Sequence, residues 1–218
     1  DETDLFNASL YPGDDKLEKS NQRIDYGFDF SVDSKKTNLN TNLFVGQSVR
    51  IRKNNNFSST SGLQERWSDI VGKVGFGFNK NTNLSYRFLF DKDQFRTRRD
   101  ELRLSTKIYN NELSIGYLYM EPTSGISDER EEFNLSTTQT INDNYSLRYS
   151  IREDLSESGA GLLGQSLSLK FNNECFTTEI SFSRSYSLDR EIKPNDTIGI
   201  NFIFKTLGTF STGRSISN

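Results

Sequence analysis

The chain has 218 residues, of which 33% are hydrophobic, and its mean hydropathy of -0.70 is low for a globular protein that buries a core. Phe (17) and Tyr (9) are nonetheless plentiful, which argues against disorder. The near-balanced net charge of -3 makes nucleic acid a poor partner, and the absence of histidine excludes Ser-His-Asp and Cys-His catalysis as well as His-ligated zinc.

The single cysteine excludes both a Cys-only zinc site and an internal disulfide. These residue types leave an Asp/Glu-based hydrolase open; we expect no enzymatic activity, no catalytic residues, no cofactor and no metal site. No apolar run is long enough for a spanning helix, and no signal peptide is recognisable. Because the chain opens on "DETDLF" without a methionine, we interpret it as a piece of a longer protein.

Apolar residues alternate with polar ones along nearly the whole chain, which is the period of a β-strand with two different faces. In chain order, the alternating sets predict about eleven strands, at 24–32, 39–45, 70–78, 84–90, 102–108, 113–119, 133–141, 145–151, 167–171, 176–182 and 198–204. Short Asn-rich turns, such as "NKNTN" and "YNNE", alternate with long polar links at 49–67, 91–99, 121–131, 153–163 and 187–196. This order predicts an antiparallel up-and-down sheet with one tight end and one loopy end.

The alternation leaves open what covers the apolar face. A soluble β-sandwich or solenoid would pack this face against a second protein layer. Strands of about 9–11 residues, strictly alternating turn and loop lengths, and tyrosines at strand ends favour a transmembrane β-barrel wall. We therefore expect an all-β, antiparallel up-and-down transmembrane β-barrel wall, an incomplete fragment of a larger barrel.

On the opposite face, charges of both signs are interleaved, for example Arg87, Glu101 and Arg103. Partial ion pairs on a hydrated wall and a dedicated solute path both fit this pattern.

Several phrases together resemble the LPS-assembly outer-membrane protein family, also called the organic solvent tolerance protein or LptD family. They are "LFNASLYPGDDKLEKSNQRIDYGF", "LFVGQSVRIRKNNNFSSTSGLQERWSDIVGKV", "RFLFDKDQFRTRRDELRL" and "NNECFTTEISFSRSYSLDREIKPNDTIGINFIFKTLG". The resemblance runs over most of residues 5–208. It implies that residues 1–218 are the C-terminal portion of an outer-membrane β-barrel, whose N-terminal jelly-roll and remaining strands are absent from this sequence.

The resemblance also implies a function. Members of this family insert lipopolysaccharide into the outer leaflet of the Gram-negative outer membrane, through a barrel that opens between its first and last strands. The implied partners are lipopolysaccharide, a plug lipoprotein, a periplasmic lipopolysaccharide bridge that acts through the missing jelly-roll, and outer-membrane lipid. Alternatives from other classes are a passive porin or channel barrel, an outer-membrane phospholipase or protease, and a soluble β-rich adhesin.

Site residues follow from the resemblance. Residues 198–207 would form the last strand and one lip of the lateral gate, with the candidate gate residues Ile198, Ile200, Phe202 and Phe204. Lys205, Thr206 and Gly208 either weaken the tight end of that strand or form an ordinary strand terminus. Cys175 is implied to bond to a cysteine of the N-terminal domain; otherwise it is a small buried residue at a strand end.

Two further expectations concern the outer loops. Ser61, Gly62 and Leu63 form a family landmark in the long link at 49–67. Arg96, Arg98 and Arg99 are candidates for contacts with lipopolysaccharide phosphates through charge-assisted hydrogen bonds, or else belong to an ordinary solvated loop.

Overall fold

The structure, a computed structural model, describes residues 23–34, 36–51, 65–122, 129–157, 159, 161–186, 194–205 and 208–216. These residues form twelve β-strands. The strands are β1 (Arg23–Ser34), β2 (Leu39–Arg50), β3 (Ile70–Asn79), β4 (Thr82–Phe90), β5 (Thr97–Ile108), β6 (Asn111–Met120), β7 (Arg130–Thr140), β8 (Tyr145–Asp154), β9 (Gly161–Asn172), β10 (Phe176–Ser185), β11 (Asn195–Phe204) and β12 (Gly208–Ile216).

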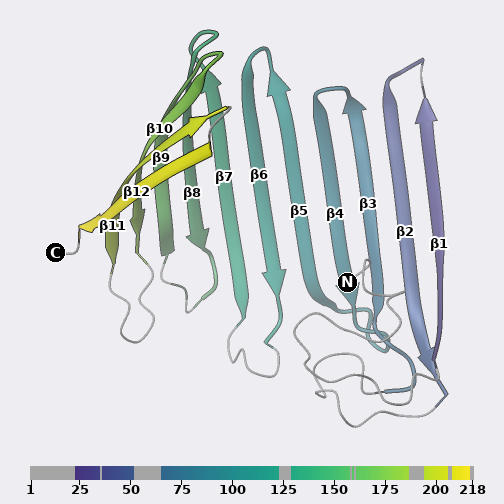
Figure 1. Cartoon of the computed structure of the whole chain (residues 1–218). Coiled ribbons are helices and arrows are strands. Elements are labelled where there is room, and N and C mark those ends of the chain that lie inside the picture. The colour runs from purple at the N-terminus through teal and green to yellow at the C-terminus, as the bar shows by residue number, and fades with distance from the viewer. Residues whose placement is uncertain are drawn as a thin grey trace. The chain divides into compact units, whose positions relative to one another are not determined.

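All twelve described strands belong to one sheet, in which each strand is hydrogen-bonded to its neighbours in the sequence. Every strand pair whose register is given is antiparallel. The chain divides into two compact units, Asp1–Arg103 with Tyr117–Arg130, and Leu104–Gly116 with Glu131–Asn218. Within each unit, the strand ends that short turns join lie together (Figure 1), and we call this the turn end and the opposite end of the strands the loop end. The predicted up-and-down order is confirmed.

Several strands are longer than the sequence predicts, among them β2, β5 and β9, and one strand was missed. β5 begins at Thr97, inside the expected link at 91–99. Strand pairing uses backbone groups, so the strand continues into polar residues beyond the apolar stretch. The strand expected to be last, 198–207, is β11, which ends at Phe204 and pairs with β12 along its whole length. β12 was missed because Gly208–Ile216 contains two glycines and one aromatic residue, and so lacks the apolar alternation.

Asparagine side chains close the short turns. The Oδ1 atom of Asn142 accepts hydrogen bonds from the backbone N–H groups of Asn144 and Tyr145, at 3.0 and 2.9 Å. Asn173 does the same for Cys175 and Phe176, at 2.9 and 2.8 Å. Because an asparagine side chain can replace a backbone acceptor two or three residues on, these residues favour the tight turns that the sequence predicted.

The strand registers place the large apolar residues on one face of the sheet. Phe28 lies opposite Val45, Leu43 opposite Val74, and Val74 opposite Tyr86. In the second unit, one face likewise carries three aligned pairs, Leu147 with Leu169, Leu169 with Ile180, and Ile180 with Ile200. We call this surface the apolar face and the opposite surface the polar face.

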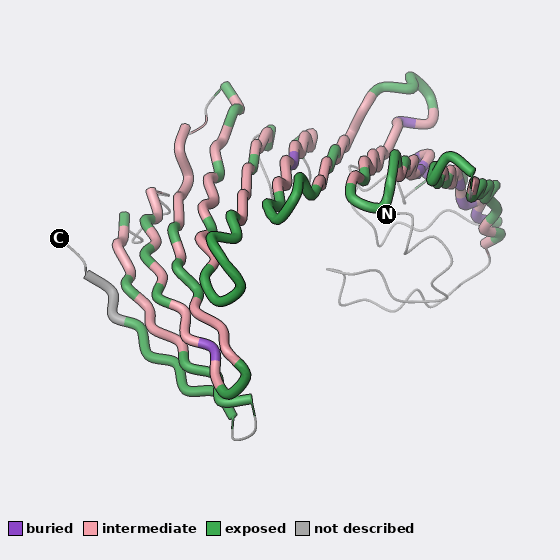
Figure 2. The backbone as a smooth tube through the Cα atoms, turned by 90° about the horizontal axis from the view of Figure 1, so that it is seen from above, coloured by how far each residue is buried: buried purple, intermediate pink, exposed green. Residues whose placement is uncertain are grey.

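No part of the chain that the structure describes forms a second layer against the apolar face. Among the described residues, Val71 is the only hydrophobic side chain that is buried, whereas Phe28, Phe78 and Ile180 are 50–60% exposed. Figure 2 shows that buried positions are few and scattered along the tube. A β-sandwich would bury these side chains between two sheets, so the arrangement contradicts the sandwich alternative. Within the described ranges, no helix is long and apolar enough to cross a membrane.

An aromatic row crosses the turn end of β8 to β12. Its rings belong to Tyr145, Phe171, Phe176, Phe204 and Phe210, and successive ring centroids lie 4.9, 5.6, 6.4 and 6.2 Å apart. Toward the loop end, the same face becomes polar, because Arg184 and Asp196 lie opposite each other in β10 and β11. An apolar band with aromatic rings at its border is typical of the outer surface of a membrane barrel.

A lysine substitution on each face tests which side meets lipid. Ile180→Lys is expected to lower the free energy of unfolding by about 2–4 kcal/mol, the cost of a cation near the middle of the lipid-facing surface. Ser181→Lys, the next residue on the polar face, is expected to change it by less than about 0.5 kcal/mol. Denaturant midpoints of the protein in lipid bilayers measure both values, and equal midpoints for the two variants would contradict the assignment of the faces.

Candidate functional site

Buried polar residues gather at the loop end of β1 to β5. Ser48, Ser68, Asp69 and Asp91 are only 2–7% exposed, in a sheet whose other described residues are rarely buried. With Asp25 and Arg98 they form what we call the loop-end cluster. Its members come from four segments far apart in the sequence, each of which lies in one of the family-like phrases.

The first half of the cluster joins β1, β2 and the segment before β3. The Ser48 hydroxyl donates to Asp25 Oδ1 at 2.6 Å, and the Arg23 Nε donates to Asp25 Oδ2 at 3.0 Å. Ser68 accepts from the Ser48 backbone N–H at 2.9 Å, and the Gln47 side chain donates to the Ser68 carbonyl at 2.8 Å. The ends of β1 and β2 are thereby fastened to the chain that leads into β3.

The second half is a buried ion-pair group. Arg98 donates to Asp91 Oδ2 through Nη2 at 2.5 Å, and its Nε lies 3.1 Å from Asp69 Oδ2. Asp91 also closes its own turn by accepting the N–H groups of Asp93 and Gln94, each at 2.9 Å. One guanidinium therefore serves two buried carboxylates, from the segments before β3 and after β4.

These contacts shift the pKa values of the two carboxyl groups in opposite directions. The hydrogen bond from Arg98, with those from the backbone of Gln94 and Asp93, holds the pKa of Asp91 well below its usual range. Burial raises the pKa of Asp69, and the positive charge of Arg98 opposes this shift. Asp69 Oδ2 is buried and has no hydrogen-bond partner among the described residues, so Arg98 is its main source of compensation.

Each of the three candidate phosphate-binding arginines lies beside a carboxylate. Arg96 lies 3.0 Å from Glu121, and Arg99 lies 3.3 Å from Glu101. Arg98 belongs to the loop-end cluster and its side chain is only 21% exposed. The sequence placed all three in one loop, whereas Arg98 and Arg99 lie within β5 and so alternate between the two faces.

Replacing Arg98 tests the loop-end cluster. Arg98→Gln leaves the carboxylates of Asp69 and Asp91 buried without a cation, so the free energy of unfolding should fall by about 3–5 kcal/mol. The matched control is Arg148→Gln, because Arg148 is exposed and donates to Thr138 at 3.2 Å. Denaturant midpoints in bilayers measure both variants.

A second substitution separates this ion-pair effect from a general folding defect. Asp69→Asn, added to Arg98→Gln, should restore part of the lost stability because one of the uncompensated charges is removed. An Arg98→Gln variant as stable as Arg148→Gln would refute the structural role of the cluster.

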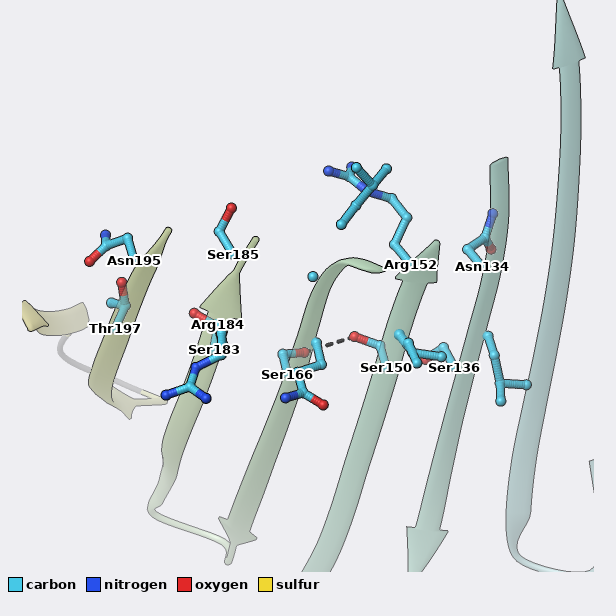
Figure 3. Close-up of a pocket in the computed structure, with 15 residues that line it drawn as sticks. Asn134, Ser136, Ser150, Arg152, Ser166, Ser183, Arg184, Ser185, Asn195 and Thr197 are labelled. Atoms are coloured by element: carbon cyan, nitrogen blue, oxygen red, sulfur yellow. Dashed lines mark hydrogen bonds between the residues drawn. The ribbon is translucent and has the colours of Figure 1, made fainter. Parts of the chain in front are cut away.

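The polar face of the second unit is lined with hydroxyl groups. The registers align Ser136, Ser150, Ser166, Ser183 and Thr197 in one row across β7 to β11. These small side chains leave a shallow hollow of about 470 Å³, with Arg152, Ser185 and Asn195 farther toward the loop end (Figure 3). Ser150 and Ser166 are hydrogen-bonded to each other at 2.7 Å, as the dashed line shows. The row is a neutral, hydrated surface.

A charged group lies on the polar face of the first unit. Glu101 lies 3.9 Å from Arg87, 3.3 Å from Arg99 and 3.5 Å from Arg103. The interleaved charges of the sequence thus form ion pairs here, with more cations than carboxylates. Among the described residues, no group of three or more His, Cys, Asp or Glu side chains is placed to hold a metal ion.

The remaining candidates lie in separate places. Ile198, Ile200, Phe202 and Phe204 occupy the apolar face of β11, which has a neighbour on each side. Cys175 is a free, exposed thiol in the turn between β9 and β10, which excludes the alternative of a buried small residue. Ser61, Gly62 and Leu63 lie outside the described residues.

The buried residues Ser48, Ser68, Asp69 and Asp91 were missed as site residues. Their only signal in the sequence was their position, since each polar residue stands beside an apolar run inside a family-like phrase. Burial of a polar side chain depends on neighbours from other strands, and no local pattern reports these neighbours.

Comparison with known proteins gives one family. The family model "LPS transport system D" (LptD) matches residues 1–145. No curated protein matches. Among solved structures, two mutants of Rhodopseudomonas blastica porin are similar at 10% and 11% identity, with TM-scores of 0.48 and 0.49; each comparison covers 88% of this chain and 84% of the porin.

Proposed function

This chain belongs to the LPS transport system D (LptD) family. We propose that it forms the part of the barrel wall next to the opening through which lipopolysaccharide moves laterally into the outer leaflet. The family transports lipopolysaccharide in the outer membrane, as a β-barrel and not as an enzyme. The proposed step is the lateral release.

The exposed apolar face carries the proposal. Phe28, Phe182 and Ile198 are large apolar side chains that the described residues leave exposed, so hydrocarbon is the medium that matches this side of the sheet. The polar face offers the opposite environment, a row of hydroxyl groups in one unit and ion pairs in the other. A wall with these two faces separates a hydrated interior from lipid, as a molecule with a polar glycan and apolar acyl chains requires.

β12 is a better candidate for the gate lip than β11. Phe204, Phe202 and Ile200 on β11 lie opposite Gly208, Phe210 and Thr212 on β12. β12 therefore presents less apolar surface than its neighbour, and its glycines weaken strand pairing. An unpaired strand edge in lipid costs several kcal/mol for each exposed amide group, so a strand with low intrinsic stability suits an edge that opens only briefly.

Photo-crosslinking at matched depth tests the gate. A benzophenone amino acid replaces Thr212 in one variant and its register partner Ile200 in the other, and irradiation is performed in cells. Crosslinks to lipopolysaccharide at Thr212 should fall several-fold once lipopolysaccharide synthesis is stopped, because they report molecules in transit. Those at Ile200 should persist, because they report lipid already in the leaflet.

A constant ratio of the two signals after the block would overturn lateral release beside β12. The passive porin would be favoured by a different pair of results. The purified protein would conduct solutes, and neither crosslink would change when lipopolysaccharide synthesis is stopped.

The resemblance supports a larger assembly. We propose that residues 1–218 are the C-terminal portion of a barrel, and that a jelly-roll domain, a plug lipoprotein and a periplasmic lipopolysaccharide bridge complete the path. Cys175 lies at the turn end, where its backbone carbonyl accepts the N–H of Lys205 at 3.1 Å. Short turns of outer-membrane barrels face the periplasm, an oxidising compartment in which an exposed thiol readily forms a disulfide.

The state of Cys175 is measured on the protein purified from membranes without reductant. Thiol labelling should leave Cys175 unmodified until reductant is added, and mass spectrometry of the linked peptides should identify a cysteine of the jelly-roll domain. The plug lipoprotein should co-purify in the same preparation, also with Cys175→Ser. Full labelling of Cys175 before reduction would refute the disulfide.

A further inference from the structure

We propose that Lys73, Arg87, Arg99 and Arg103 form a phosphate-binding site on the polar face of β3 to β5, for phosphate groups of the lipopolysaccharide that passes along it. We call these four residues, together with Glu101, the cation cluster. The proposal rests on the transport of lipopolysaccharide, and it assigns a binding step to particular side chains of the interior wall.

The cluster places like charges at neighbouring positions of one face. Lys73 on β3 lies directly opposite Arg87 on β4, so both side chains project from the same face at neighbouring positions. Two like charges that face each other across a strand pair are destabilising. Arg99 and Arg103 add cations from β5, two positions before and after Glu101 on the same face.

A single carboxylate does not neutralise this group. Within the described part of the chain, Glu101 is the one acidic partner of Arg99 and Arg103, and Lys73 has no ion-pair partner within 4.0 Å. The distances from Glu101 to its arginines, 3.3–3.9 Å, are long for charge-assisted hydrogen bonds, which are typically about 2.7–2.9 Å. Glu101 therefore leaves most of the five N–H donors of Arg99 and of Arg103 without an acidic partner among the described residues.

The exposure of the cluster fits an anionic ligand that arrives from the polar side. Arg87 and Arg99 are 39% and 37% exposed, and Arg103 is 63% exposed, in contrast to Arg98 in the loop-end cluster. The next pair on the same face, Gly75 and Ser85, carries no charge. Guanidinium groups bind phosphate oxygens in a bidentate geometry. A bound phosphate would therefore offset the repulsion among the four cationic side chains.

The proposal requires phosphate and not any anion. Lipopolysaccharide carries both phosphate and sugar carboxylate groups, and the two are separated by using lipopolysaccharide with its phosphates enzymatically removed. The protein in nanodiscs is titrated with intact and with dephosphorylated lipopolysaccharide. Intact lipopolysaccharide should bind at least about tenfold more tightly, and the difference should shrink as salt is raised.

Substitutions assign this selectivity to the cluster. Arg87→Gln with Arg103→Gln should reduce the ratio of the two affinities to about one, whereas Arg87→Lys with Arg103→Lys should retain part of it because the charge remains. Arg148→Gln, an exposed arginine on the polar face of β8, is the matched control and should leave the ratio unchanged. Glu101→Gln should tighten binding of intact lipopolysaccharide, because a competing carboxylate is removed.

The Glu101→Gln variant separates a role in binding from a role in stability. If Glu101 served only to stabilise the fold through its ion pairs, its replacement would not strengthen the binding of lipopolysaccharide. Denaturant midpoints show whether each variant is folded. Selectivity that is unchanged in the double glutamine variant, or equally lost in Arg148→Gln, would overturn the proposal. The crosslink at Thr212 tests lateral release independently of the cation cluster. If the protein selects for phosphate but the Thr212 crosslink does not depend on lipopolysaccharide synthesis, release beside β12 is refuted and the phosphate-binding site is supported.

Discussion

The exposure of the apolar face, which none of the described residues covers with a second layer, is the constraint on which the rest of this structure depends. Each of the strands β2 to β11 has a hydrogen-bonded neighbour on both sides, so this part of the sheet can lie in a medium that offers no hydrogen bonds. The side chains of that face, such as Phe28 and Ile180, remain exposed to whatever surrounds the sheet. Hydrocarbon stabilises them as a second protein layer would in a sandwich. A chain with one buried hydrophobic side chain among its described residues thereby has a stable fold.

This constraint also explains where the charges lie. Charged side chains on the polar face are hydrated, so Glu101 and its arginines form long, loose ion pairs. At the loop end, neighbouring segments cover the polar side chains, and the ion pairs become short and buried, as between Arg98 and Asp91. A buried pair is costly to break because the partner is left uncompensated. The loop-end cluster therefore holds segments together, whereas the cation cluster remains available to a ligand.

Much of the fold was predictable because strand alternation and turn chemistry are local. The pattern from Ile24 to Val32 shows its two faces without reference to other strands, and Asn142 and Asn173 close their turns within three residues. β12 escaped detection because Gly208 and Thr212 stand where apolar residues would complete the pattern, and only pairing with β11 holds them in a strand. The start of β5 was misplaced for a similar reason, since Thr97 and Asp100 are polar but have strand neighbours.

The sequence by itself determined the fold class, the two faces, the alternation of turns with links and the exclusion of histidine chemistry, because each follows from residue type or from a period of two. Only the tertiary structure decided which side chains meet. Lys73 faces Arg87, and Arg98 reaches Asp69, because each turn and each strand pair sets the alignment of the next strand. Register shifts between Gly77 and Asn79, and between Arg152 and Glu153, change which residues of neighbouring strands lie opposite each other. Contacts across strands therefore depend on the whole sheet, whereas the pattern within a strand does not.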